Sequence, residues 1–312
     1  MENLVIIGAG TAGLSAAVYA ARADLSPLVI KGTQPGGQIT LTDAVENYPG
    51  YPDGITGFDL FMNMEKQASR FGARYANEEA VSVDFSSQPF SIKTHENTYE
   101  AKSVIIATGS DPRKLNVPGE KEFIGKGVSY CATCDGFFYK GREVVVVGGG
   151  DSAIDEGLFL TKFASKVTVI HRRDRLRANQ HLQNRAFENE RMAFVWDSTV
   201  EEITGENAVT GLTLKNVKSG DTSSYKTDGV FIFIGHIPNT DIFENIIDMD
   251  DSGIILANKR QQTNIPGVFV AGDVQDSIYR QAITSAGTGA VAAMEAEKFL
   301  AEMEGTSYPG KF

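Results

Sequence analysis

Short apolar runs alternate along this chain with longer stretches in which apolar residues recur at helical spacing. Near the N-terminus the run LVII is followed by Gly8, Gly10 and Gly13, an alanine-rich amphipathic stretch and a second apolar run at 27–30. This order predicts a strand, a glycine turn, a helix and a strand within about 30 residues. Because glycine backbone at a helix N-terminus lets a pyrophosphate approach amide N–H groups, the segment predicts a dinucleotide site.

The same pattern returns at residues 142–177. The run VVVV leads into Gly148 and Gly150, Ser152 and Ala153 lie at the start of the next helical stretch, and KVTVI supplies the second strand. The glycine spacing is the GxGxxA form of the dinucleotide fingerprint, in the strand, turn and helix context that the fingerprint requires. Two such units predict that the chain binds two dinucleotides.

The two units differ where the second strand ends, at the position that reads the adenosine ribose. In the second unit this position carries His171, Arg172 and Arg173, followed by Arg177, and no acidic residue. Guanidinium groups form charge-assisted hydrogen bonds to the 2′-phosphate of NADP, whereas a carboxylate would suit the free hydroxyl of NAD. A solvated basic helix start is the alternative. The first unit has Lys31 there, which departs from the acidic residue expected for a plain ribose.

Two further segments each predict a buried strand that ends in a glycine turn. They are SVIIATGS at 103–110 and GVFVAGDV at 267–274. Ligands of open α/β sheets bind at the carboxyl ends of such strands, where Asp273 could accept hydrogen bonds from sugar hydroxyls. An aspartate that caps the next turn is the alternative for this position. The small and apolar residues over 277–303 then predict a long helix.

The order of these segments predicts one domain inserted into another. We expect an α/β fold with two Rossmann-like three-layer domains, one formed by residues 1–115 and 237–312 and the other by residues 116–236. Proline and glycine residues mark the joints at 111–120 and 235–240. Two short connections between two domains favour hinge motion.

Composition narrows the class of protein. With 312 residues, 42% of them hydrophobic and 22% charged, the chain is large enough for about two globular domains. No apolar run reaches the roughly 18 residues of a membrane helix, and the first ten residues lack a basic secretion signal. We therefore expect a soluble cytoplasmic protein. The net charge of −11 argues against a nucleic-acid-binding face.

The only two cysteines, Cys131 and Cys134, form a CxxC motif. In a reducing compartment such a pair is more often catalytic or metal-binding than structural. A structural zinc site needs four ligands, and the four histidines stand at unrelated spacings, so we expect no metal. Asp135 follows directly and could transfer protons to and from the thiols if burial raises its pKa. An N-cap role is the alternative for Asp135.

Taken together, these motifs resemble those of bacterial low-molecular-weight thioredoxin reductases, within the FAD- and NADPH-dependent pyridine nucleotide-disulfide oxidoreductases. The likeness covers nearly the whole chain, in the family's order, and its motifs are GAGTAG, GGQI, ENYPG, ATG, CATCDGFF, GGGDSA, HRRDRLR, IGHIPN, AGDV and YRQAITSAGTG. The combination of CATCD, HRRxxxR and an embedded second dinucleotide unit is more specific than any one motif.

The resemblance implies FAD in the outer domain, NADPH in the inserted domain and a redox-active disulfide between Cys131 and Cys134. It assigns Cys134 to the flavin-facing position and Cys131 to attack on the disulfide of thioredoxin. It also implies a homodimer. The FAD site would contain Gly8, Gly10 and Gly13 at the pyrophosphate, Gly37, Gln38 and Asn47 at the flavin, and Asp273, Gln281 and Ala282 at the ribityl chain and ring.

Other functions remain open at this point. A reductase of a different disulfide protein is one, although the peroxiredoxin-reducing relatives carry an extra N-terminal domain for which the position of Gly8 leaves no room. A ferredoxin-linked relative would lack the arginine cluster. A non-catalytic redox sensor would bind both dinucleotides without needing the two thiols.

Two finer hypotheses follow. If the inserted domain carries both the nicotinamide and the disulfide, one flavin face cannot meet both at once, so we expect this domain to rotate between two poses. In the C-terminal segment EGTSYPGKF, a ring of Tyr308 or Phe312 could stack on the flavin or on the partner subunit, and a disordered end is the alternative.

Overall fold

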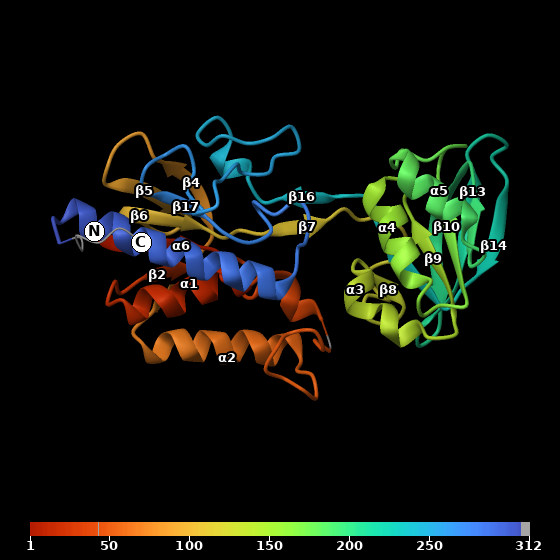
Figure 1. Ribbon diagram of the computed structural model, residues 1–312, viewed down its shortest axis with the longest axis horizontal. Helices are drawn as coiled ribbons and strands as arrows, with labels where there is room; N and C mark the ends of the chain where they lie inside the picture. The colour runs from red at the N-terminus through yellow and green to blue at the C-terminus, as the bar shows by residue number, and fades with distance from the viewer. Residues whose placement is uncertain (43, 307–312) are drawn as a thin grey trace. The chain divides into compact units, whose positions relative to one another are not determined.

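The computed structural model describes residues 1–42 and 44–306 of the chain, which form two compact units. Unit 1 contains Met1–Asp111 and Ile237–Phe312, and unit 2 contains Pro112–His236. The chain leaves unit 1 through β7 (Ser110–Pro112) and returns through β16 (His236–Pro238), and these two strands pair with each other (Figure 1). The residues Tyr308 and Phe312 lie outside the described residues.

A seven-stranded sheet forms the centre of unit 1. Its order is β3 (Arg74–Ala76), β2 (Leu28–Ile30), β1 (Glu2–Ile7), β6 (Thr98–Ile106), β5 (Phe90–Thr94) and β4 (Ala80–Asp84), with β17 (Val268–Val270) also paired to β6. The strands from β3 to β6, and β17, run parallel, whereas β5 and β4 add an antiparallel extension.

Both faces of this sheet are covered, which explains why its central strands are continuous apolar runs. Leu4 and Ile6 of β1 pack against helices α1 (Thr11–Arg22), α2 (Gly57–Arg70) and α6 (Ala282–Met303), which lie together on one side of the sheet in Figure 1. Val5 and Ile7 face the opposite side, where Phe243, at the end of the 3-10 helix η3 (Asp241–Phe243), completes the second core.

Unit 2 has three layers around a parallel sheet. The sheet order is β11 (Met192–Val195), β10 (Lys166–Ile170), β9 (Glu143–Val147), β15 (Gly229–Ile232) and β8 (Val128–Ser129). One face packs on α4 (Asp151–Leu160) and α5 (Gln180–Glu188), and the other on an antiparallel sheet of β12 (Ser198–Gly205), β13 (Val209–Asn216) and β14 (Thr222–Lys226). The shorter elements are the 3-10 helices η1 (Gly37–Leu41) and η2 (Gly136–Tyr139) and the helix α3 (Ala132–Asp135).

The predicted α/β fold with parallel sheets is confirmed, and each glycine motif joins a strand to a helix as expected. The long helix of the C-terminal segment begins at Ala282 rather than at residue 277. The carboxylate of Asp276 accepts hydrogen bonds from the N–H groups of Ile278, Tyr279 and Arg280, and Arg280 has a φ of 47°. This side-chain cap competes with helical hydrogen bonding and delays the helix start.

Among residues 1–42 and 44–306, no helix combines the length and the hydropathy that a bilayer crossing requires.

Helices α1 and α6 of unit 1 are in close contact. A Cβ atom added at Gly289 of α6 would lie 2.1 Å from the carbonyl oxygen of Ala12 in α1, so only glycine permits this approach. The Ser15 hydroxyl also donates to the carbonyl of Ala286 across the same contact, at 2.7 Å. By contrast, a Cβ at Gly287, two residues earlier, would meet no atom within 4 Å.

These two glycines predict opposite effects of the same substitution. Gly289→Ala should lower the free energy of unfolding by roughly 2–3 kcal/mol, because the methyl group forces α1 and α6 apart. Gly287→Ala should raise it by about 0.5–1 kcal/mol, because alanine loses less conformational entropy in a helix. Urea unfolding followed by circular dichroism measures both values. Equal effects of the two substitutions would contradict the close contact as the reason for glycine at 289.

Candidate active site

The two cysteines form a disulfide at the start of helix α3. The Cys131 and Cys134 sulfur atoms are bonded, with their Cα atoms 5.3 Å apart. Cys131 is the N-cap residue of α3, and its Sγ accepts a hydrogen bond from the Cys134 N–H at 3.2 Å. The Ser129 hydroxyl accepts a hydrogen bond from the Cys131 N–H at 3.1 Å and so fixes the backbone of Cys131. The sulfur pair is therefore held on a short, hydrogen-bonded turn.

Asp135 is the last residue of α3. Burial raises the pKa of its carboxyl group, and a hydrogen bond with Ser129 opposes that shift in part. Its side chain makes no capping hydrogen bond to the following η2 helix. Asp135 thus occupies the N-cap position of η2, but its side chain does not cap the helix. A half-buried carboxyl group next to the disulfide, kept protonated to higher pH than usual, has the chemistry of a proton donor to sulfur.

The first glycine turn leaves no room for side chains at Gly8 and Gly13. A Cβ at Gly13 would lie 1.9 Å from the Gly8 carbonyl oxygen, and a Cβ at Gly8, whose φ is 109°, would lie 2.3 Å from the Ala107 carbonyl oxygen. Gly10 is the N-cap of α1 and caps it with no side-chain hydrogen bond, and no acidic residue stands in the first turn. Bare amide N–H groups and the positive helix end fit the pyrophosphate of a dinucleotide.

Two of the residues expected at the flavin contact each other. The Asn47 Nδ2 donates to the Gln281 Oε1 at 3.2 Å, and Gln281 is the N-cap of α6, which Ala282 begins. Gln38 lies in η1 and donates from its Nε2 to an Asp111 carboxylate oxygen at 2.5 Å. Side-chain amide groups from segments that are far apart in the sequence therefore lie together in unit 1.

Gly37 begins η1 and has a φ of 62°. A Cβ atom added at this residue would meet no atom within 4 Å. It is thus an open backbone position at the start of the GGQI segment.

Asp273 lies just beyond the carboxyl end of β17. Its Oδ1 accepts a hydrogen bond from the Ser285 hydroxyl of α6 at 2.7 Å, and burial raises the pKa of its carboxyl group. This contact ties the strand end to the helix instead of capping the next turn. The Asp273 carboxylate remains suited to accept hydrogen bonds from sugar hydroxyls, the chemistry inferred from its position.

The Lys31 side chain forms an ion pair and two ring contacts within unit 1. Its ammonium group pairs with Glu65 of α2 at 2.7 Å, its side chain is only 12% exposed, and the rings of Phe61 and Tyr75 lie 5.6 and 5.5 Å from its Nζ. The departure from an acidic residue at this position therefore has a structural use, because the ion pair and the two rings join the end of β2 to α2.

The second glycine turn has the same close packing and a basic neighbour. A Cβ at Gly148 would lie 2.4 Å from the Phe233 carbonyl oxygen, and one at Gly149 would lie 2.5 Å from the His171 ring. The Arg177 N–H donates to the Gly149 carbonyl at 2.7 Å. Gly150 is the N-cap of α4 without a side-chain capping bond, and Ser152 is exposed on its first turn.

His171 is buried beneath three arginines. Burial lowers the pKa of its imidazole, and the positive charges of Arg177, Arg172 and Arg173 lower it further, which favours the neutral ring. The three arginines are exposed, and none of them has an ion-pair partner among the residues that the structure describes. The first turn of α4 carries Asp151, whose Oδ1 accepts hydrogen bonds from the Asn179 backbone N–H and Nδ2. Guanidinium groups without an ion-pair partner among the described residues, beside this helix N-terminus, fit the phosphates of a nucleotide, the 2′-phosphate included.

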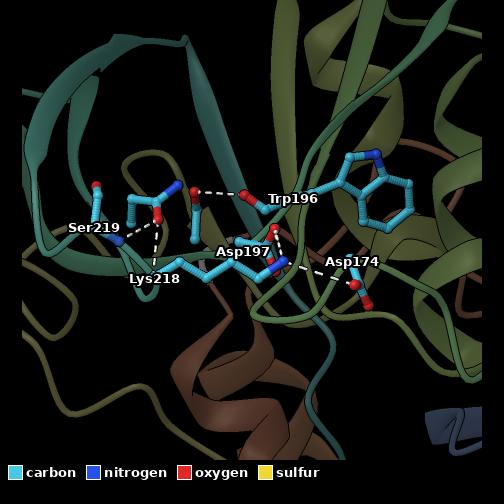
Figure 2. A network of polar contacts seen from close by, with 7 residues as sticks. Asp174, Trp196, Asp197, Lys218 and Ser219 are labelled. Carbon is cyan, nitrogen blue, oxygen red and sulfur yellow. Dashed lines mark hydrogen bonds and ion pairs between the residues drawn. The ribbon is translucent and has the colours of Figure 1, made fainter.

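An ion-pair network supports this arginine loop (Figure 2). The Lys218 ammonium lies 2.8 Å from an Asp197 carboxylate oxygen and 3.7 Å from one of Asp174, which stands between Arg173 and Arg177 in the sequence. The Asp197 N–H donates to the Arg173 carbonyl at 3.3 Å. The turn between β13 and β14 thus contacts the loop and places a lysine near the one carboxylate within it. Sequence reasoning missed these contacts, since nothing in the spacing joins residue 218 to residue 174.

Known proteins are similar to this chain over nearly its full length. The family model described as pyridine nucleotide-disulphide oxidoreductase matches residues 2–289. A Rickettsia bellii protein named thioredoxin reductase is 54% identical, with 96% of this chain and 98% of the relative covered. Solved thioredoxin reductases from Streptococcus pyogenes and Lactococcus lactis are 43% and 42% identical, cover 97% of this chain and 99% and 100% of their own chains, and give TM-scores of 0.92 and 0.66.

The family match, the disulfide of the CxxC turn and the two glycine turns agree with one another. This chain belongs to the pyridine nucleotide-disulphide oxidoreductase family.

Proposed function

We propose that the protein is an NADPH-dependent flavoprotein that reduces the disulfide of thioredoxin. The observation that carries the proposal is the Cys131–Cys134 disulfide on a turn next to a half-buried acid, in the same unit as a glycine turn with three unpaired arginines. The names of the full-length relatives support the same activity. A ferredoxin-linked reductase would not need the arginines, and a non-catalytic sensor would not need the thiol pair.

Each unit has its own ligand in this proposal. In unit 1, the turn from Gly8 to Gly13 would hold the FAD pyrophosphate, and Gly37, Gln38, Asn47, Asp273, Gln281 and Ala282 would contact the remainder of the FAD. In unit 2, Gly148, Gly150 and Ser152 would hold the NADPH pyrophosphate, and His171, Arg172, Arg173 and Arg177 would surround the 2′-phosphate. A bound flavin supplies the chemistry that joins two-electron hydride transfer to thiol–disulfide exchange.

The protein's own groups manage the sulfur chemistry. When two electrons reach the disulfide through Cys134, the S–S bond breaks and Cys131 leaves as a thiolate, which Asp135 can protonate. Asp135 then takes a proton back as the Cys131 thiolate attacks the disulfide of thioredoxin and forms a mixed disulfide. Cys134 attacks the mixed disulfide, which releases reduced thioredoxin and restores the Cys131–Cys134 bond.

Unit 2 carries both the arginine loop and the disulfide, so we propose that it rotates relative to unit 1 between the two half-reactions. Only two chain crossings join the described parts of the units, and they pair as the short β7 and β16 strands. The two solved relatives of nearly equal identity differ widely in TM-score, which different arrangements of the same two units would produce. We further propose a cytoplasmic homodimer, in line with the resemblance noted from the sequence.

The electron path predicts the result of an anaerobic titration. NADPH should remove the visible absorbance of the bound flavin, and added thioredoxin should then show new thiols with a thiol reagent. Cys131→Ser should keep the first step and abolish thiol release, because no attacking sulfur remains. If NADPH fails to change the absorbance, the donor is different, and reduced ferredoxin is the next donor to test.

A covalent crosslink between the units tests the rotation in the same assay. A locked protein should complete one half-reaction and lose turnover, because one pose is inaccessible. Full turnover in the locked protein would rule out the rotation.

The arginine loop predicts cofactor preference. Replacing both Arg172 and Arg173 with alanine should raise the KM for NADPH by roughly 10–100-fold, because charge-assisted bonds of about 1.5–3 kcal/mol are lost. The KM for NADH should change little. Arg175→Ala is the matched control, because this exposed arginine lies in the same loop outside the proposed phosphate ligands. Equal effects on NADPH and NADH would argue against recognition of the 2′-phosphate.

The environment of Asp135 predicts a pH effect. Because burial raises the pKa of this carboxyl group, its protonated form persists to higher pH than that of an ordinary aspartate and is lost as the pH rises past the raised pKa. The rate of disulfide reduction should fall over the same range. Asp135→Asn should lower kcat by about 100-fold or more and remove this limb of the pH profile measured between pH 5 and 9. A variant with the wild-type profile would exclude Asp135 as the proton donor, and Asp251→Asn, at an exposed position in unit 1, serves as control.

A further inference from the structure

A second carboxylate contacts the disulfide turn from the opposite helix. Glu156 lies on α4, and its Oε2 accepts a hydrogen bond from the Ala132 N–H of α3 at 3.2 Å. The Thr133 N–H also contacts this carboxylate. Both partners lie between the two cysteines in the sequence, and helices α3 and α4 belong to the same unit. Glu156 thus reaches the backbone of the CxxC turn without being part of the motif.

The amide donors of this turn are divided between two acceptors. The Cys134 N–H donates to the Cys131 sulfur, whereas the Ala132 and Thr133 N–H groups are directed to Glu156. Free N–H groups at such a turn would stabilise a thiolate on Cys131 once the disulfide is reduced. Glu156 takes up two of these donors and places a negative charge at the same turn, and both effects disfavour the thiolate.

Opposing influences act on the charge of Glu156. Burial raises the pKa of its carboxyl group, the nearby Asp155 on its own helix raises it further, and the two backbone hydrogen bonds oppose the shift. From the facing α3 helix, the titratable side chain is Asp135. No lysine or arginine forms an ion pair with Glu156 in the part of the chain that the structure describes. Its charge is therefore not cancelled by a neighbouring cation.

We propose that Glu156 is a positioning residue that holds the CxxC turn through its backbone and makes the Cys131–Cys134 dithiol a stronger reductant. The proposal rests on the disulfide reductase function proposed above and deepens it. A dithiol whose thiolate is disfavoured is less stable in its reduced form, so it gives its two electrons and two protons to an acceptor disulfide more readily. The acceptor disulfide is reduced to two thiols as the Cys131–Cys134 bond forms.

Glu156→Gln tests the charge while keeping an amide oxygen that can accept the Ala132 N–H. In the dithiothreitol-reduced full-length protein, thiolate absorbance at 240 nm as a function of pH gives the ionisation midpoint of the reactive thiol. We expect the midpoint to fall by about one pH unit in the variant. For a thiol that ionises near pH 8.5, this shift moves the equilibrium with dithiothreitol about fivefold toward the reduced enzyme at pH 8.5.

Two further variants separate position from charge. Glu156→Ala removes the acceptor as well, so it should shift the midpoint at least as far and also lower kcat through disorder of the turn, whereas Glu156→Gln should retain most of kcat. Glu188→Gln removes one exposed negative charge from α5 in the same unit and should leave the midpoint unchanged.

An unchanged midpoint in both Glu156 variants, or an equal shift in Glu188→Gln, would overturn the proposal. Neither thiol ionisation nor the equilibrium with dithiothreitol uses NADPH or thioredoxin. A failure of the proposed donor or substrate therefore remains distinguishable from a failure of this inference.

Discussion

The absence of side-chain volume at the two strand-to-helix turns is the constraint on which the rest of this structure depends. Gly8 and Gly13 bring β1, α1 and the end of β6 so close together that a single methyl group would overlap backbone atoms, and Gly148 does the same in unit 2. The close approach leaves the first amides of α1 and α4 uncovered by side chains. The same feature that packs the two sheets against their helices therefore creates two places where a phosphate can meet the backbone.

Two regions of unit 2, the second glycine turn and the disulfide turn, are surrounded by charged groups of opposite sign. Around the second glycine turn, the exposed arginines have no ion-pair partner within residues 1–42 and 44–306, and Lys218 lies 3.7 Å from the one acidic residue of their loop. Around the disulfide, the ionisable groups are half-buried carboxyls, Asp135 and Glu156, whose pKa values burial raises. One region is thus suited to hold an anion and the other to manage protons at sulfur, although both lie on the same five-stranded sheet and its helices.

The motifs and the tertiary structure contribute different parts of the site. The cysteines, Asp135, both glycine turns and the arginines could be found from spacing alone, because each lies within a short segment whose local conformation follows from its residues. Ser285 beside Asp273, Gln281 beside Asn47 and Lys218 beside Asp174 could not, because their sequence separations are set by how the sheets bring the segments together. The start of α6 was missed for a local reason, the capping of three amides by Asp276.

By itself, the sequence determined the α/β class, the two strand–glycine turn–helix units, the insertion of one unit into the other and the pairing of two cysteines in one short turn. Periodicity, glycine spacing and residue type act over a few turns of chain. Only the tertiary structure decided that Lys31 is bound to Glu65, that the half-buried Asp135 side chain makes no capping hydrogen bond and that Glu156 reaches the backbone between the cysteines. These outcomes depend on burial and on contacts between distant segments. The shift of a pKa and the choice of a hydrogen-bond partner are set only when such contacts form.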